Sequence, residues 1–178
     1  MAGDVMAGRF TDPGLRVYDL AEEVLVRCPG CGGCAVVLAQ LGGVSEQRTH
    51  AGWVLTRRGL RCGGCGHARD EFQGRRAYGG SVDPYFGLPL WLVADCCGGR
   101  QLWAYNPAHL DLLEGYIAAR LRERDATRGL PTSLLEKLPA WVKSAKHRTE
   151  LLRTIRRLRA SIPHERRLPW ERDGEPAV

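Results

Sequence analysis

Short apolar runs separated by glycine-rich turns fill the first half of the chain. Val24-Leu25-Val26, residues 34–41 and Trp53-Val54-Leu55-Thr56 are apolar runs of strand length, and polar or glycine residues follow each of them. Runs of this kind are typical of β-strands. The pattern therefore predicts three apolar strands in this half, with polar loops between them, and a further polar, exposed strand over 67–72.

The mostly apolar stretch from Leu90 to Tyr105 predicts a β-hairpin. Near its middle is the pair Gly98-Gly99, which is typical of a two-residue hairpin turn. If Cys97 pairs with Arg100 across this turn, both faces of the hairpin are apolar. We therefore expect the hairpin to be central, with the preceding strands on one face and helices on the other.

Two helices are predicted after the hairpin. Asn106-Pro107 supplies a good N-cap and first helical residue, and leucine and isoleucine then recur every three or four positions, which predicts a helix over 107–125. A second long helix is expected over 141–161, and Pro163 ends it. A short helix over 134–138 lies between the two.

These elements predict an α+β fold in four parts. Residues 1–16 are rich in Gly, Ala and Asp and predict a flexible N-terminus. A β domain is expected over 17–106, with its added hairpin at 90–105. A helical segment over 107–162 packs on it, and a polar, proline-containing tail over 163–178 is expected to be disordered.

The composition is that of an ordinary soluble protein with an excess of positive charge. Of its 178 residues, 44% are hydrophobic and 26% are charged, and the formal net charge is +6. No apolar run approaches the roughly 18 residues of a membrane span, and no signal-peptide pattern is visible at the start. Four of the seven cysteines stand in metal-binding pairs, described below, so the cysteines fit a reducing cytosol better than a disulfide framework. These features predict a cytoplasmic protein and permit an acidic partner such as nucleic acid.

Four of the cysteines form two Cys-x-x-Cys pairs, Cys28 with Cys31 and Cys62 with Cys65, and glycine follows each pair directly. A two-residue gap lets a tight turn point both sulfurs at one ion, and glycine tolerates the positive φ that such a turn requires. Four thiolates suit a tetrahedral Zn²⁺ and leave no open coordination position. The sequence therefore predicts one structural zinc ion bound by these four cysteines.

The two pairs, called hooks below, resemble those of the zinc-ribbon superfamily. They read Cys28-Pro29-Gly30-Cys31-Gly32 and Cys62-Gly63-Gly64-Cys65-Gly66, which match the C-P-x-C-G and C-x-x-C-G patterns of that family. The likeness covers residues 24–72 and implies that each hook lies at the tip of a β-hairpin. Residues 32–61 are a longer gap than the roughly 15–20 residues of a minimal ribbon, so an enlarged ribbon is implied.

The overall pattern is similar to poorly characterised bacterial zinc-ribbon proteins. Some of these are related in their ribbon to replication-restart helicases and transcription factors. In such relatives the ribbon binds nucleic acid or a protein partner. The resemblance therefore implies one of these two partners and does not distinguish between them.

The remaining cysteines and two histidines leave alternatives open. Cys34 extends the first hook to a third cysteine, which permits an iron–sulfur cluster, or it packs as a small apolar residue. Cys96 and Cys97 point to opposite faces of a regular strand, so a second metal site needs further ligands that no clear pair supplies. His50 and His67 lie near the hooks but are not needed beside four thiolates. A thioredoxin-like redox role requires a βαβ pattern, which is not visible.

Positive charge is concentrated toward the C-terminus. Between Pro139 and Arg172 the cations outnumber the anions ten to three. A basic helix face is one way in which proteins contact a phosphate backbone, and the alternative is a solvated basic surface. We predict contacts to nucleic acid from a basic helix face and from a second patch in the β domain, namely Lys146, Arg153, Arg156 and Arg157, and Arg57, Arg58, Arg75 and Arg76.

No catalytic constellation is visible. The chain has no P-loop, no Gly-x-Ser-x-Gly elbow and no His-Glu-x-x-His motif. The spacing of Asp70, Glu71, Asp83 and Asp95 does not require a metal-dependent nuclease site, so we do not expect an enzyme. Two functions remain: a zinc-stabilised module that binds DNA or RNA through its basic helix, or an adaptor for a protein partner with a purely structural zinc site.

Overall fold

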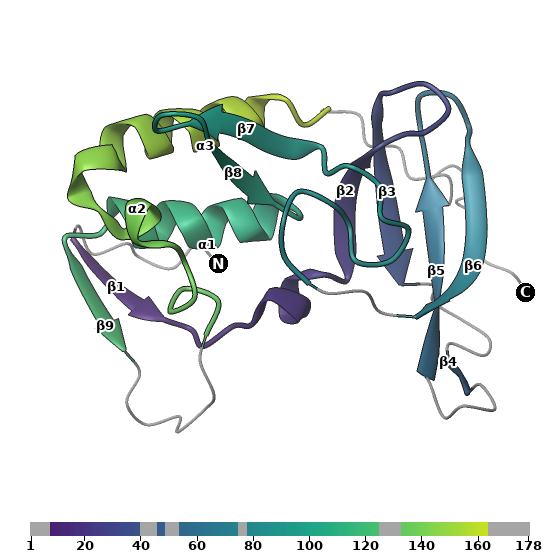
Figure 1. The fold of residues 1–178 in the computed structure, drawn as a ribbon, viewed down its shortest axis with the longest axis horizontal. Helices are drawn as coiled ribbons and strands as arrows, with labels where there is room; N and C mark the ends of the chain where they lie inside the picture. Colours follow the sequence, from purple (N-terminus) through teal and green to yellow (C-terminus); the bar gives the residue numbers. More distant parts are fainter. Residues whose placement is uncertain (1–7, 40–45, 49–53, 75–77, 125–132, 164–178) are drawn as a thin grey trace, which may run out of the picture.

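An antiparallel sheet and a helical layer lie side by side, and a β-hairpin runs between them (Figure 1). The fold is α+β, as predicted from the sequence pattern.

No helix in the described part of the chain is long and apolar enough to cross a membrane. The predicted tail, residues 163–178, lies outside the described residues apart from Pro163. The computed structural model describes residues 8–39, 46–48, 54–74, 78–124 and 133–163.

The elements follow one another in a mixed order along the chain. The sheet and hairpin contain β2 (Glu23–Arg27), β3 (Cys34–Ala39), β4 (Glu46–Arg48), β5 (Val54–Arg61), β6 (Ala68–Gly74), β7 (Leu92–Cys96) and β8 (Arg100–Ala104). The remaining elements are β1 (Arg9–Asp12), η1 (Val17–Leu20), α1 (Pro107–Ala118), β9 (Leu121–Arg124), α2 (Ala140–Lys143), η3 (Ala145–His147) and α3 (Arg148–Ala160).

The sheet consists of two β-hairpins that pair side by side. β2 pairs with β3 and β5 pairs with β6, all antiparallel, and β3 and β5 join the two hairpins. The short strand β4 pairs with the first residues of β5, beyond the end of β3. Each hook therefore lies between the two strands of one hairpin, and the pairing of β3 with β5 brings the hooks to the same end of the sheet.

β2 is the most deeply buried strand. Val24, Leu25 and Val26 are each 0% exposed. One edge of β2 pairs with β3, and on the other edge the Leu25 N–H donates to the carbonyl oxygen of Tyr105 at 2.7 Å. The Leu25 carbonyl oxygen also accepts a hydrogen bond from the N–H of Trp91 at 2.9 Å. Leu25 and the pair Val24 and Val26 belong to two different buried clusters, so both faces are covered, which explains the apolar run in the middle of β2.

The hairpin β7–β8 forms where it was predicted, but its register differs by one residue. Cys96, and not Cys97, pairs with Arg100, so the prediction of a two-residue turn is wrong. The loop holds three residues, all with positive φ (50°, 79° and 82°). Glu150 of α3 accepts a hydrogen bond from the Cys97 N–H at 2.5 Å, which fixes the first of these residues in the loop. The register thus depends on a helix far away in the sequence.

The shift of one residue changes which side chains share a face of the hairpin. Leu92, Leu102 and Ala104 share a buried cluster with α1 and α3. Val93 and Trp103 are partly buried against the cluster formed with the sheet. The hairpin is therefore covered on both faces, as expected.

α1 begins at Pro107 as predicted but ends at Ala118, so the prediction of a helix to residue 125 is wrong. The backbone of Ala119 is already extended, with φ −63° and ψ 139°. The next residues form β9, which pairs in parallel with β1 near the other end of the chain. A strand pairing of this kind overrides the helical spacing of the leucines, because it satisfies the backbone hydrogen bonds in another way.

β1 lies in the stretch that was predicted as a flexible N-terminus, residues 1–16, and this corrects the prediction for its described part. The N–H of Leu121 donates to the carbonyl oxygen of Gly8 at 2.8 Å and begins the pairing with β9. Phe10 of β1 packs directly over Gly115 of α1, where an added Cβ would lie only 3.0 Å from the Phe10 ring. The missing side chain at Gly115 therefore makes room for β1 against α1.

The predicted C-terminal helix is broken into three pieces. The backbone of Ser144 is extended (φ −74°, ψ 130°), and its side chain accepts a hydrogen bond from the Lys146 N–H at 3.3 Å. α2 ends there, η3 follows, and α3 packs on α1 through Leu151, Ile155 and Leu158. Lys146 therefore lies in η3 and not on the helix face to which the sequence pattern assigned it.

Asn106 links the helical layer to the sheet. Its side-chain oxygen accepts a hydrogen bond from the His109 N–H at 2.9 Å, and its amide donates to the carbonyl oxygens of Leu20 and Glu23 at 2.7 and 2.8 Å. His109 is 1% exposed, and its Nδ1 accepts a hydrogen bond from the Tyr105 N–H at 3.3 Å. Burial lowers the pKa of His109 to about 4, so the imidazole is neutral at pH 7.

We expect mild acid to destabilise the protein through His109. Its folded pKa of about 4 lies below its ordinary value of 6.5, so the stabilisation is present above pH 6.5 and is lost as the pH falls toward 4. The loss between pH 7 and pH 5 is about 2 kcal/mol. Urea unfolding at both pH values measures it. The His109→Gln variant shares every other titrating group, and an equal pH dependence in that variant would contradict the prediction.

Candidate metal centre

The four hook cysteines converge at one end of the sheet. All four Sγ atoms lie within 4.8 Å of one another. The Sγ atoms of Cys28 and Cys65 are 3.6 Å apart, and those of Cys31 and Cys62 are 3.7 Å apart. A tetrahedral ion with metal–sulfur distances of about 2.3 Å places its sulfurs roughly 3.8 Å apart. The spacing therefore fits a single tetrahedral ion.

The first hook is held by hydrogen bonds within its own turn. The Gly32 N–H donates to the carbonyl oxygen of Cys28 at 2.8 Å, and the Cys28 N–H donates to the carbonyl oxygen of Gly33 at 2.8 Å. The Gly30 N–H lies 3.3 Å from the Cys28 sulfur, to which it donates. Gly32 has φ +71°, which a residue with a side chain adopts only with strain.

The second hook repeats this geometry. The Gly66 N–H donates to the carbonyl oxygen of Cys62 at 3.0 Å, and the Cys62 N–H donates to the carbonyl oxygen of His67 at 2.9 Å. Gly66 has φ +75° and takes the place that Gly32 has in the first hook. Two turns of the same construction thus present their sulfurs to a common point, each between the strands of one hairpin.

The pKa values of two of the hook thiols favour a divalent cation. Burial opposes ionisation of Cys62, but backbone hydrogen bonds from Cys65 and Gly64 outweigh it and lower the pKa of Cys62 to about 7. For Cys65, a backbone hydrogen bond from His67 lowers the pKa, but the neighbouring Cys31 and other hook thiols outweigh it and raise the pKa to about 12. One thiolate thus forms near neutral pH, and its negative charge opposes ionisation of the next thiol. A dication removes this repulsion, so the donor set fits Zn²⁺.

Two cysteines of the centre face the interior and two face solvent. Cys28 and Cys62 are 3% and 2% exposed, whereas Cys31 and Cys65 are exposed. Cys34 does not belong to the set of four, and it packs half-buried against the cluster of the helical layer. The structure therefore agrees with the apolar interpretation of Cys34. His67 lies beside the hooks but is not one of the four ligands, and His50 is outside the described residues.

A second group of ligand-type side chains was not found from the sequence. Cys97, His147 and Glu150 have one ligand atom each within 4.8 Å of the others. They come from the hairpin loop, η3 and α3, so no sequence spacing connects them. Burial raises the pKa of Cys97 to about 12, which keeps the thiol protonated, and Glu150 already accepts a hydrogen bond from the Cys97 N–H. We interpret this group as the contact that anchors the hairpin loop on α3.

The arginines predicted to contact nucleic acid on the last helix lie together. Arg153, Arg156 and Arg157 are exposed on the face of α3 that points away from its buried leucines. Arg157 donates a hydrogen bond to the carbonyl oxygen of Asp95 at 3.4 Å. Lys146 is also exposed but belongs to η3. The structure thus groups three of these four cations on one helix.

The arginines of the predicted second patch in the β domain are less exposed where the structure describes them, at Arg57 and Arg58. The Arg58 guanidinium lies 3.9 Å from the centre of the Tyr85 ring, and two of its nitrogens are buried. Arg57 is half-buried on the same strand, β5. Arg75 and Arg76 lie outside the described residues. Arg58 therefore serves to pack the ring of Tyr85, and the described residues do not form a second open patch here.

The four acids that were considered for a metal site belong to no group of ligand atoms within 4.8 Å in the described part of the chain. Asp83 is 0% exposed, and its carboxylate accepts hydrogen bonds from three backbone N–H groups in its own loop. Asp70 pairs with Arg61 on the exposed surface of the sheet, and Asp95 is exposed on β7. Glu71 pairs with the neighbouring Arg69, an ion pair in the same strand.

No family model, curated protein or solved structure matches this chain. The candidate metal centre rests on its own geometry: four cysteines within metal-binding distance, two matching turns and a shared end of one sheet. This arrangement is compatible with a zinc ribbon.

Proposed function

We propose that this protein is a zinc-stabilised nucleic-acid-binding module. In this proposal the hooks bind one structural Zn²⁺, the sheet is an enlarged zinc ribbon, and the outer face of α3 contacts the phosphate backbone. The observation that carries the proposal is the row of exposed arginines on α3, namely Arg153, Arg156 and Arg157.

The two faces of α3 have opposite characters. Leu151 and Ile155 are each 0% exposed and fix the helix against α1 and the hairpin. On the outer face, no carboxylate in the described part of the chain pairs with Arg153 or Arg156. Arg159, by contrast, is held by both Asp111 and Glu114 of α1, at 2.5 and 2.6 Å.

This contrast separates a structural arginine from those available to a partner. A guanidinium already bound by two carboxylates contributes little net charge to the surface, whereas unpaired guanidinium groups remain available for phosphate oxygens. Arg153, Arg156 and Arg157, of which Arg157 also donates to the carbonyl oxygen of Asp95, can follow a backbone from a rigid helix without reading its bases. The proposal therefore concerns binding to phosphates and predicts little dependence on sequence.

The test is a salt titration of binding to labelled single- and double-stranded DNA and RNA, on protein with one zinc per chain. We expect affinity to fall steeply between about 50 mM and about 200 mM salt. Changing Arg153, Arg156 and Arg157 together to alanine should reduce the slope of log affinity against log salt for duplex DNA by about 3. The same three positions changed to lysine retain the charge and should retain most of the slope.

Two results would overturn the proposal. The first is no binding at low salt by protein that carries its zinc. The second is equal slopes for the alanine and lysine variants. The first result would favour the adaptor hypothesis, in which the zinc only holds a surface for a protein partner, and the next step would be to identify that partner.

A further inference from the structure

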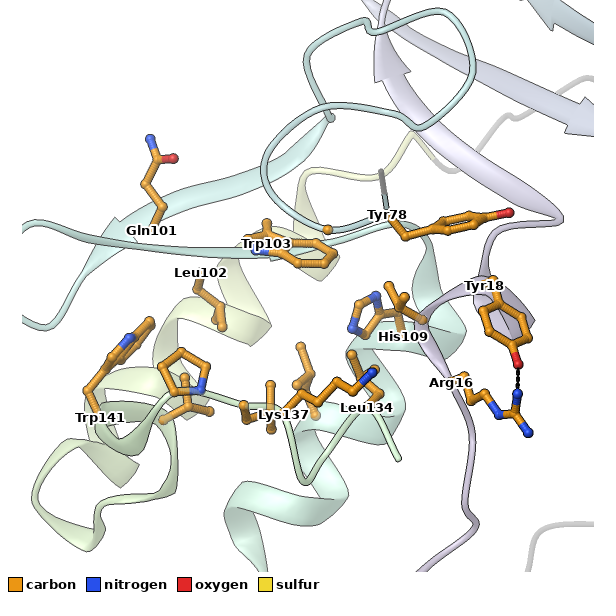
Figure 2. A pocket seen from close by; sticks show the side chains of 16 residues that line it. Arg16, Tyr18, Tyr78, Gln101, Leu102, Trp103, His109, Leu134, Lys137 and Trp141 are labelled. Carbon is orange, nitrogen blue, oxygen red and sulfur yellow. Dashed lines mark hydrogen bonds between the residues drawn. The ribbon is translucent and has the colours of Figure 1, made fainter. Parts of the chain in front are cut away.

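A cavity of about 260 Å³ lies between η1, β8, α1 and the turn that precedes α2 (Figure 2). This volume is slightly below the range of about 300–1,000 Å³ that is usual for small-molecule sites. Its floor is apolar, with Leu113 and Leu134 among the lining residues. The cavity lies apart from the hooks, so the metal centre does not account for it.

The walls of the cavity are rich in aromatic rings. Trp103 lies over the centre in Figure 2, Trp141 at its left end, and Tyr18 and Tyr78 at its right. Trp103 is already in edge-to-face contact with the buried His109, with the ring centres 5.4 Å apart. Aromatic faces of this kind bind a flat ring by stacking or by edge-to-face contact. The shape of the wall therefore suits a planar ligand.

His109 offers one directed hydrogen-bond donor to this space. Its Nδ1 accepts a hydrogen bond from the Tyr105 N–H, so the neutral imidazole carries its proton on Nε2. No group in the described part of the chain accepts a hydrogen bond from Nε2, although the side chain is only 1% exposed. Figure 2 shows the imidazole between Trp103 and Leu134, facing the cavity. A buried donor of this kind favours a ligand with an acceptor atom in its ring.

The charges around the cavity are positive. Arg16 and Lys137 both line it, and no aspartate or glutamate does so among the described residues. Arg16 donates a hydrogen bond to the Tyr18 hydroxyl, drawn as a dashed line in Figure 2, and its guanidinium lies at the outer edge of the cavity. Lys137 is exposed, and no carboxylate in the described part of the chain pairs with it.

We propose that this cavity binds a small planar aromatic anion. The ring lies against Trp103, an acceptor on the ring takes the hydrogen bond from His109 Nε2, and a carboxylate or phosphate on the ligand meets Lys137. Two sources share this chemistry, a nucleoside monophosphate and an aromatic carboxylate. The cavity does not include the outer face of α3, so this proposal can be tested separately from the binding of nucleic acid.

Fluorescence titration of the zinc-loaded full chain tests the proposal, because Trp103 and Trp141 line the cavity and report ring contact. The probes are adenosine monophosphate and quinoline-6-carboxylate, both of which carry a ring nitrogen as acceptor. Adenosine and inorganic phosphate are the controls for the first probe and quinoline is the control for the second, because each control lacks the charge or the ring. We expect saturable quenching by at least one of the two anions with a Kd below about 1 mM. Binding of the matching control should be at least tenfold weaker. The anion that binds identifies the source.

Matched variants show whether the signal comes from the cavity. Lys137→Gln should weaken binding at least fivefold, whereas Lys146→Gln, which removes an equally exposed lysine outside the cavity, should leave the Kd unchanged. The triple alanine variant of the α3 arginines should also bind the anion normally. Zinc content and melting temperature confirm that each variant is folded. No binding of either anion at about 1 mM, or equal effects of the two lysine variants, would overturn the proposal.

Discussion

Replacing Cys31 with serine is expected to abolish metal binding and to unfold the sheet around the hooks. Structural zinc contributes about 10–16 kcal/mol of apparent binding free energy in zinc-finger peptides, which is comparable to the whole stability of a domain. Losing one of four thiolates therefore removes much of what holds the hooks together. We expect the melting temperature to fall by roughly 10 °C or more, at about 2–4 °C for each kcal/mol. Cys62→Ser should have the same effect.

Metal content and thermal melting measure this result together. Cys34→Ser is the matched control, because Cys34 lies next to the first hook but outside the set of four sulfurs. That variant should keep one zinc per chain and lose little stability. Retention of the metal by both Cys31→Ser and Cys62→Ser would contradict the assignment of the site. A count of two metals in the wild type would instead point to the group formed by Cys97, His147 and Glu150.

Replacing Asp83 with alanine is expected to be nearly as damaging, although the residue lies far from the hooks in sequence. Its carboxylate accepts hydrogen bonds from the N–H groups of Tyr85, Phe86 and Leu88 at 2.9, 2.8 and 2.5 Å, and its side chain is fully buried. Alanine leaves these donors without an acceptor, at about 1–3 kcal/mol for each one that water does not reach. We expect a total loss of roughly 3–5 kcal/mol in the free energy of unfolding.

Two further substitutions show that the hydrogen bonds are the cause. Asp83→Asn keeps one acceptor oxygen and should lose about half as much stability, because its amide cannot accept a hydrogen bond from the third donor. Asp95→Ala removes an exposed aspartate and should change stability by less than about 0.5 kcal/mol. Equal urea midpoints for Asp83→Ala and Asp95→Ala would show that the buried carboxylate does not organise its loop.

The metal centre could be located from the sequence because each hook is a local structure. The two-residue gap between cysteines and the glycine after them are needed by a turn whose hydrogen bonds all fall within six residues, as between Cys28 and Gly33. The same is true of the start of α1, where Asn106 and Pro107 act through contacts with their immediate neighbours. Structures that depend only on neighbouring residues can be recognised directly from the sequence.

The features that the sequence did not predict depend on contacts between distant segments. The helical spacing of leucines continued past Ala118, but parallel pairing with β1 decided the outcome there. The three-residue hairpin loop is held by Glu150, which accepts a hydrogen bond from the Cys97 N–H. The cavity combines η1, β8 and α1 with the turn before α2, so no short stretch of sequence carries its pattern. Such contacts become visible only when the chain is folded.

The backbone hydrogen bonds on both edges of β2 have a consequence for how the protein unfolds. One edge of β2 belongs to the hairpin that carries the first hook, and the other donates to Tyr105 and accepts from Trp91 at the two ends of the β7–β8 region. Removing the metal therefore loosens a strand that the helical layer also uses. Amide hydrogen exchange after chelation should quicken not only around the hooks but also in β8 and the first turn of α1. Metal binding would then stabilise the helical layer as well as the sheet, because backbone hydrogen bonds through β2 connect the two.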